Sequence, residues 1–182
     1  MTVGNEFKGF IDSVTAYADA YANLEEMQAE LDFIPRHGDQ KTGLIGEVYI
    51  YKYLEQLGYT NLEYGSTSNK GWDIRGYLDG GKVDIQVKTV SAFSKTRMIS
   101  PIHPGWQHLY LLSLDRNFKP DGLWLIDHPN LIFQHGEERI ASRKMATRNQ
   151  TKRTGSASLF NHAEDIFKDF RICMGEYLTE QR

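Results

Sequence analysis

The sequence predicts an α/β protein in which a central β-sheet is flanked by helices. Residues 6–33 and 42–57 repeat apolar side chains at the three-four spacing of amphipathic helices. Residues 83–90 alternate apolar and polar side chains, as a half-buried strand does. Residues 109–114 and 122–127 are nearly continuous apolar runs, which are typical of central strands covered on both faces.

The first predicted helix forms an N-terminal extension. Its apolar positions keep helical spacing except at Gln28, and Pro35 follows its end. The apolar stripe consists of Phe10, Val14, Tyr17, Tyr21, Leu24 and Leu31. We therefore assign residues 1–35 to a helical extension and residues 36–182 to the main domain. The extension is expected to pack either on the core or against a second subunit.

The second predicted helix carries an isolated acid. Gly58 ends this helix as a C-cap residue. The expected buried stripe is Leu44, Val48, Tyr51 and Leu54. Glu47 lies at the edge of this stripe, and two interpretations stay open for it. It is either a surface residue or a carboxylate turned toward a cleft.

A β-hairpin is predicted around the turn residues 79–81, whose sequence is Asp-Gly-Gly. Asp73, near the start of the first strand, would then face Gln86 and Lys88 on the second strand. Side chains alternate faces along a strand, so the apolar residues of 83–87 are buried while the polar ones share the other face. An ordinary strand with a solvated face has the same alternation, and this alternative stays open.

These side chains suggest a particular chemistry. A carboxylate oxygen, an amide oxygen and an ammonium group around one point can hold Mg²⁺ beside a phosphate. Asp73, Gln86 and Lys88 supply these three groups. The arrangement predicts metal-assisted hydrolysis of a phosphodiester.

With Glu47 added, residues 40–91 resemble the PD-(D/E)XK nuclease superfamily. The family pattern is a Glu on the first core helix, an Asp on a strand, and (D/E)-x-K on the next strand. Glu47, Asp73 and the run Gln86-Val87-Lys88 match these positions. The chain departs from the commonest pattern because Gln86 replaces an acid and no Pro precedes Asp73. Gln at this position is similar to the variant in Mrr-type enzymes and some homing endonucleases.

The resemblance implies a restriction-endonuclease-like core with a mixed sheet over residues 36–182. It implies a Mg²⁺-dependent DNA endonuclease, of restriction type and duplex-specific, acting as a homodimer, with Mn²⁺ as a substitute metal. Asp73, Gln86, the Val87 carbonyl and Glu47 would be the metal ligands. Lys88 would position or activate the attacking water, or offset charge in the transition state. The alternative is a catalytically inactive DNA-binding or assembly protein that keeps the fold.

Charge is distributed unevenly along the chain. The net charge is −3, yet residues 139–163 hold six basic residues and no acid, which leaves 15 basic and 24 acidic residues elsewhere. The basic residues are Arg139, Arg143, Lys144, Arg148, Lys152 and Arg153. Such a stripe is expected for phosphate contacts, although a solvated basic helix has the same composition. We predict DNA contacts here and at Lys95 and Arg97, and helices over 137–148 and 162–172.

Composition limits the other possibilities. The 182 residues, 40% hydrophobic and 25% charged, are ordinary for a globular domain. No apolar run of membrane-spanning length and no apolar signal core occur, so we expect a cytoplasmic protein without membrane association. Cys173 is alone, which excludes an internal disulfide. No HExxH, G-x-S-x-G or P-loop motif is present.

Overall fold

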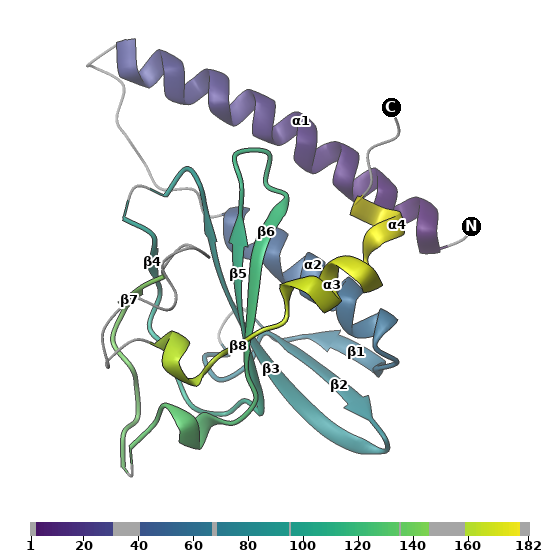
Figure 1. Cartoon of the computed structure of the whole chain (residues 1–182), viewed down its shortest axis with the longest axis vertical. Coiled ribbons are helices and arrows are strands. Elements are labelled where there is room, and N and C mark those ends of the chain that lie inside the picture. Colours follow the sequence, from purple (N-terminus) through teal and green to yellow (C-terminus); the bar gives the residue numbers. More distant parts are fainter. Residues whose placement is uncertain are drawn as a thin grey trace.

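The computed structural model describes residues 3–30, 41–66, 69–94, 96–134, 136–145 and 159–178. Six strands form a mixed sheet in the order β1-β2-β3-β5-β6-β8, with β3 and β5 parallel and the other neighbours antiparallel. The strands are β1 (Thr60–Tyr64), β2 (Ile74–Leu78), β3 (Gly81–Ser91), β5 (His108–Leu114), β6 (Pro120–Ile126) and β8 (Glu164–Asp165). The helices are α1 (Val3–Glu30), α2 (Lys41–Gln56), α3 (Phe167–Cys173) and α4 (Gly175–Leu178). The predicted α/β fold with a mixed central sheet and flanking helices is confirmed (Figure 1).

The β2–β3 hairpin forms as predicted, because its turn residues tolerate the left-handed region. Leu78 pairs with Gly81, and Asp79 and Gly80 have φ values of 50° and 78°. Positive φ at both central residues defines the type I′ turn, whose twist matches that of the strands. The turn sets the register that places Asp73 opposite the middle of β3.

Helix α2 packs closely on β3 because Gly46 has no side chain. A Cβ atom at Gly46 would lie 1.9 Å from the Thr89 hydroxyl oxygen. The expected buried stripe of α2 was wrong at Leu44, which is 50% exposed. Leu54 is buried as predicted, and Ile45, Tyr49, Ile50 and Tyr53 are buried with it. Apolar residues occur all around this helix, so its close contact at Gly46, not its periodicity, selects the buried face.

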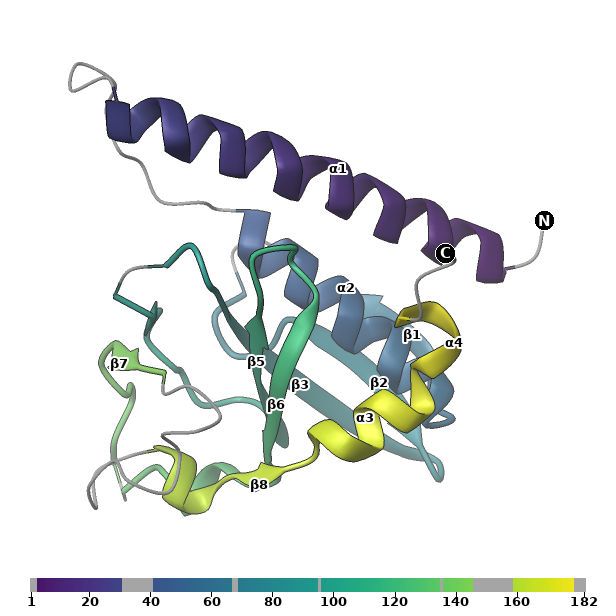
Figure 2. The ribbon, with the colours of Figure 1, turned by 45° about the horizontal axis from the view of Figure 1, so that its top comes forward.

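Helix α1 packs on the core, which is one of the two expected arrangements. Phe7, Val14 and Ala18 are buried in the same apolar cluster as α2 and the sheet. The Phe7 and Tyr49 rings meet edge-to-face with centroids 6.1 Å apart. Tyr17 contacts Phe118, at the β5–β6 turn, with a centroid separation of 5.5 Å. Figure 2 shows α1 lying across the tip of the β5–β6 hairpin and alongside α2 and α4. Among the described helices, none combines the length and hydropathy needed to cross a bilayer.

The opposite face of the sheet is covered by extended segments and short 3₁₀ helices. The strands β4 (Met98–Ile99) and β7 (Arg143–Lys144) form a two-stranded ribbon, and Ile102 pairs with Ile140 beside it. The 3₁₀ helices are η1 (Pro129–Leu131) and η2 (Leu159–His162). A second apolar cluster, which includes Trp106, Leu109, Trp124 and Ile140, lies under this layer.

Of the two helices predicted in the C-terminal half, the first is wrong in its described residues, and the second is confirmed as α3 but begins later than predicted. Within 137–148, the described residues 140–145 are extended because they pair with residues 97–102, which buries Ile140 and Met145. The helix expected from residue 162 begins at Phe167, because Glu164 and Asp165 extend the sheet by pairing with β6. Both errors come from long-range strand pairing, which local apolar spacing does not report. The predicted strands at 109–114 and 122–127 are confirmed as β5 and β6.

Candidate functional site

Asp73 lies beside the middle of β3, next to Gln86. Ile74 pairs with Ile85, and the Asp73 N–H donates to the Ile85 carbonyl at 2.8 Å. Gln86 follows Ile85 and points to one face of β3. Lys88 follows Gln86 by two residues and therefore points to this same face. The predicted alternation thus brings these three side chains to one part of the sheet.

The Asp73 side chain continues the hydrogen-bond ladder where β2 begins. Its Oδ2 accepts a hydrogen bond of 2.8 Å from the Val87 N–H. The N–H and C=O of one residue in an extended strand point to the same side. The Val87 carbonyl is therefore directed toward the side on which Asp73 lies, as a ligand role for this carbonyl requires.

Gln86 carries a buried oxygen without a hydrogen-bond partner. The residue is 1% exposed, and its Nε2 donates to the Lys70 carbonyl at 2.9 Å. The Gly71 carbonyl lies 3.4 Å from the same nitrogen, so the reversed amide would set an oxygen against two carbonyls. Within the described part of the chain, the buried Oε1 accepts no hydrogen bond. Leaving such an acceptor unpaired costs about 1–3 kcal/mol, so a cation or water is favoured there.

Lys88 links the hairpin to the loop that follows β3. Its Nζ donates to the Ser100 hydroxyl at 3.0 Å. Burial lowers the pKa of the Lys88 amine, while Asp73 and Glu47 oppose this shift. The long loop at 91–106, expected beside the site, does contact it through Ser100. An amine of lowered pKa exchanges its proton more readily near neutral pH than an ordinary lysine does.

Glu47 approaches the same point from α2. Burial, followed by repulsion from Asp73, raises the pKa of the Glu47 carboxyl to about 7, and Lys88 partly offsets this rise. Burial likewise raises the pKa of Asp73, against the effects of the Val87 N–H and Lys88. Glu47 is half-buried and interacts with both charged groups of the hairpin. The interpretation as an inward-turned acid therefore describes it better than that of a surface residue.

The donor atoms of this cluster match a hard cation. Two carboxylates, one buried amide oxygen and a backbone carbonyl are oxygen ligands, which Mg²⁺ prefers. In the described ranges, no group of three or more His, Cys, Asp or Glu residues comes together. A cation here would thus be held by two acids and neutral oxygens. Its binding would also satisfy the unpaired Gln86 oxygen.

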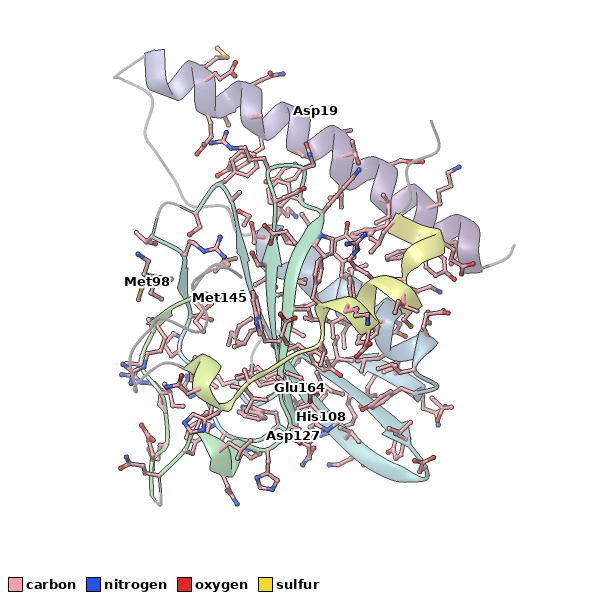
Figure 3. All side chains as sticks on the ribbon, viewed as in Figure 1. Asp19, Met98, His108, Asp127, Met145 and Glu164 are labelled. Carbon is pink, nitrogen blue, oxygen red and sulfur yellow. The ribbon has the colours of Figure 1, made fainter. Side chains whose placement is uncertain are left out.

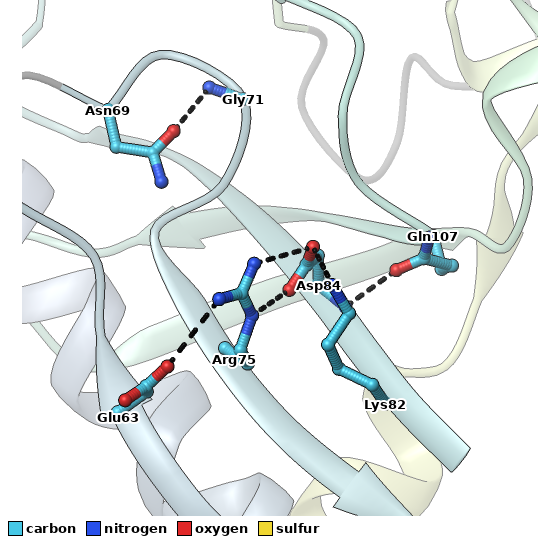
Figure 4. Close-up of polar contacts among 7 residues, drawn as sticks. All are labelled: Glu63, Asn69, Gly71, Arg75, Lys82, Asp84 and Gln107. Atoms are coloured by element: carbon cyan, nitrogen blue, oxygen red, sulfur yellow. Dashed lines mark hydrogen bonds and ion pairs between the residues drawn. The ribbon is translucent and has the colours of Figure 1, made fainter.

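An ion-pair network braces the hairpin next to this cluster (Figure 4). Arg75 and Asp84 are directly opposite, two residues along each strand from Asp73 and Gln86, and form a two-pronged ion pair. Trp72 stacks on the Arg75 guanidinium at 4.1 Å, and the Gln107 side-chain oxygen accepts from the Asp84 N–H at 2.6 Å. Asp84 is thus paired with cations and serves the hairpin. Arg75 was not predicted as part of the site, although it lies only two residues from Asp73.

The basic residues predicted to bind DNA divide into three groups. Arg139, Arg143 and Lys144 are exposed, and the last two lie on β7 opposite Ile99 and Met98, next to Ser100. Figure 3 shows Met98 and Met145 at this β4–β7 ribbon. Arg97 instead donates to the Met145 carbonyl at 3.2 Å and to the Ser113 hydroxyl at 3.0 Å, so it ties the ribbon to β5. The remaining predicted residues, Lys95, Arg148, Lys152 and Arg153, lie outside the described residues.

Comparison with known proteins gives limited information. No protein-family model matches the chain, and no curated protein matches it. A solved structure of a bacterial homing endonuclease, I-Ssp6803I, is similar over 77% of this chain and 97% of that chain, with a TM-score of 0.40 and 14% sequence identity. At this level of structural similarity, the function is inferred from the side chains of the site.

Proposed function

We propose that this protein is a metal-dependent DNA endonuclease that hydrolyses phosphodiester bonds. The proposal depends on one observation. Burial and the charge of Lys88 act on the pKa values of Glu47 and Asp73, and the neighbouring Gln86 has a buried oxygen that accepts no hydrogen bond from the described residues. Clusters of acids and a lysine with perturbed pKa values are typical of catalytic sites.

Five residues have distinct roles in this proposal. Asp73, Glu47, the Gln86 Oε1 and the Val87 carbonyl would hold Mg²⁺, with Mn²⁺ as a substitute. When bound, the cation supplies charge neutralisation on the phosphate and a lowered pKa for a coordinated water. Lys88, held by Ser100, orients the attacking water or offsets the negative charge that develops on the phosphate.

DNA would be held partly by the exposed cations of the β4–β7 ribbon. Arg143 and Lys144 pair with strand β4, which leads directly into Ser100, the hydrogen-bond partner of Lys88. Phosphate contacts at the ribbon would therefore be made close to the catalytic lysine. The rest of the basic stretch would extend these contacts along the DNA phosphate backbone through Arg148, Lys152 and Arg153.

The described part of each chain holds one such cluster, and cutting both strands of a duplex requires two. A two-fold symmetric homodimer matches the symmetry of duplex DNA, so we propose restriction-type cleavage by a dimer. Sedimentation equilibrium with and without a duplex fragment tests this part separately from the chemistry.

Plasmid cleavage tests the proposed activity. Purified protein is expected to nick or linearise supercoiled DNA with Mg²⁺ or Mn²⁺ and to stop when EDTA is added. Lys88→Ala should abolish cleavage while DNA binding persists. Lys82→Ala removes another lysine of β3, one that contacts Asp84 at 3.5 Å, and should cut at the parental rate. Cleavage by Lys88→Ala at the parental rate would reject the assignment.

A second candidate is a DNA-binding or assembly protein without catalysis. It is favoured by the hydrogen bonds that Gln86 gives to Lys70 and that Asp73 accepts from Val87, since both side chains already serve the fold. Isothermal titration with Mn²⁺ in the presence of a duplex fragment separates the two candidates. A complete lack of metal binding supports the non-catalytic protein.

A further inference from the structure

A pair of stacked tyrosines lies beside the acidic cluster. Tyr51 follows Glu47 by four residues and precedes Glu55 by four, so the three share one ridge of α2. Tyr64, the last residue of β1, stacks on Tyr51 with centroids 4.9 Å apart and planes 18° apart. The Tyr51 hydroxyl donates to the Leu62 carbonyl at 3.1 Å, which ties the ridge to β1. The Tyr51 ring thus supports one face of the Tyr64 ring.

Tyr64 lies one residue from a backbone hydrogen bond to Asp73, a candidate metal ligand. It pairs with Ile74, and the N–H of the next residue, Gly65, donates to the Asp73 carbonyl at 2.8 Å. Burial raises the pKa of the Tyr64 hydroxyl, with further contributions from Tyr51 and Glu47. The ring therefore lies within electrostatic reach of Glu47 and one residue from a backbone contact with Asp73.

The exposed ring is suited to a flat, uncharged partner. One face of Tyr64 is covered by Tyr51, yet the residue is 46% exposed, so aromatic surface is open to solvent. Glu47 and Glu55 both lie close enough to influence the Tyr64 hydroxyl. Lys52 is ion-paired with Glu55 at 2.9 Å, so this lysine is already engaged. A nucleobase stacks on an aromatic ring whatever its sequence.

We infer that Tyr64, supported by Tyr51, forms a stacking subsite for the nucleobase next to the scissile phosphate. This inference rests on the proposed nuclease function and adds a substrate class to it. In an intact duplex both faces of each base are covered by its neighbours, so a base must leave the stack to reach a protein ring. The subsite therefore selects DNA with an unpaired or readily extruded nucleotide beside the cut.

Fluorescence titration tests this subsite without depending on cleavage. The probe is a short duplex with 2-aminopurine as a single-nucleotide bulge, compared with the same duplex fully paired, with Ca²⁺ replacing Mg²⁺. The wild-type protein should bind the bulged probe about tenfold more tightly and quench its fluorescence, as expected for one base stacked on an aromatic ring. Tyr64→Ala should lose both the preference and the quenching, and Tyr64→Phe should restore them.

Tyr77→Ala is the matched control, since Tyr77 is a 38% exposed tyrosine on the adjacent strand β2. It should keep the preference for the bulged probe. Circular dichroism and thermal melting of Tyr64→Ala establish that the variant is folded. If both probes bind but Tyr64→Ala behaves as wild type, or Tyr77→Ala loses as much, the subsite is rejected and the nuclease proposal stands. If neither probe binds, the stacking subsite and the nuclease proposal are both rejected.

Discussion

The Asp73 carboxylate accepts a 2.8 Å hydrogen bond from the backbone N–H of Val87. This contact joins the first residue before β2 to the middle of β3, at the point where the strand ladder would otherwise end. It also fixes one carboxylate oxygen relative to the Val87 carbonyl and the Gln86 side chain. A single side chain thus supports the hairpin and orients the proposed metal ligands.

Substitutions of Asp73 should separate these two functions. Asp73→Ala leaves the Val87 N–H unpaired and should lower the free energy of unfolding by about 1–3 kcal/mol. Asp73→Asn keeps an acceptor oxygen and should lose much less stability. Both variants should lose cleavage by at least about a hundredfold, because the metal ligand is gone. Urea denaturation and plasmid cleavage measure the two effects, and an active Asp73→Asn would contradict the ligand role.

Glu47 should make stability depend on pH. Its pKa of about 7 exceeds the usual 4.5, so the folded protein holds a proton that the unfolded chain releases between these values. The free energy of unfolding therefore falls as pH rises from about 5 to about 7. Glu47→Gln removes this contribution, so the stability of the variant relative to the wild type should increase as the pH rises over that range.

The measurement is urea denaturation in EDTA at pH 5 and pH 8. The control is Glu26→Gln, which changes an exposed glutamate of α1. A constant stability difference between wild type and Glu47→Gln at both pH values would show that this acid is not held in its protonated form.

Gln86→Glu should lower the stability of the metal-free protein and increase its affinity for a divalent metal. A carboxylate at this position faces the Lys70 and Gly71 carbonyls, to which the Gln86 nitrogen now donates. The loss of that donor lowers stability in EDTA, whereas the added charge favours a divalent cation. Thermal melting with and without Mn²⁺ should give a larger metal-induced rise in Tm for the variant. An equal rise in both proteins would argue against Gln86 as a ligand.

Two glycines of α2 should respond oppositely to alanine. At Gly46 the new Cβ would collide with Thr89, so Gly46→Ala should cost about 1–3 kcal/mol and displace Glu47. At Gly43 a Cβ meets nothing within 4 Å, and Gly43→Ala should stabilise the helix by about 0.5–1 kcal/mol. Chemical denaturation of both variants tests this contrast. Similar effects at the two positions would mean that α2 lies farther from β3.

The β4–β7 ribbon should contribute to the salt dependence of DNA affinity. Replacing Arg143 and Lys144 by alanine should flatten the slope of log K against log salt by up to about 0.9 for each lost phosphate contact. Lys168→Ala with Arg171→Ala, a pair of exposed cations on α3, removes the same charge elsewhere. Equal slopes for the two double variants would place the DNA away from the ribbon.

The hairpin could be predicted because its determinants are local. Asp79 and Gly80 tolerate positive φ, and the alternation in β3 determines which side chains share a face. The extended conformation of residues 140–145 and of residues 164–165 could not be predicted in this way. Their backbone groups are bound by distant strands, β4 and β6, so pairing partners far along the chain outweighed local helical spacing.

The sequence alone determined the chemistry available to this protein: an acid, an amide and a lysine in register on one hairpin, with a lone acid on the preceding helix. Only the tertiary structure decided their surroundings. The close contact between Gly46 and Thr89 brings Glu47 to the hairpin, and the course of the 91–106 loop places Ser100 against Lys88. Burial by these distant segments shifts the pKa values. Desolvation depends on the whole fold, because no local pattern records which segments exclude water from a charge.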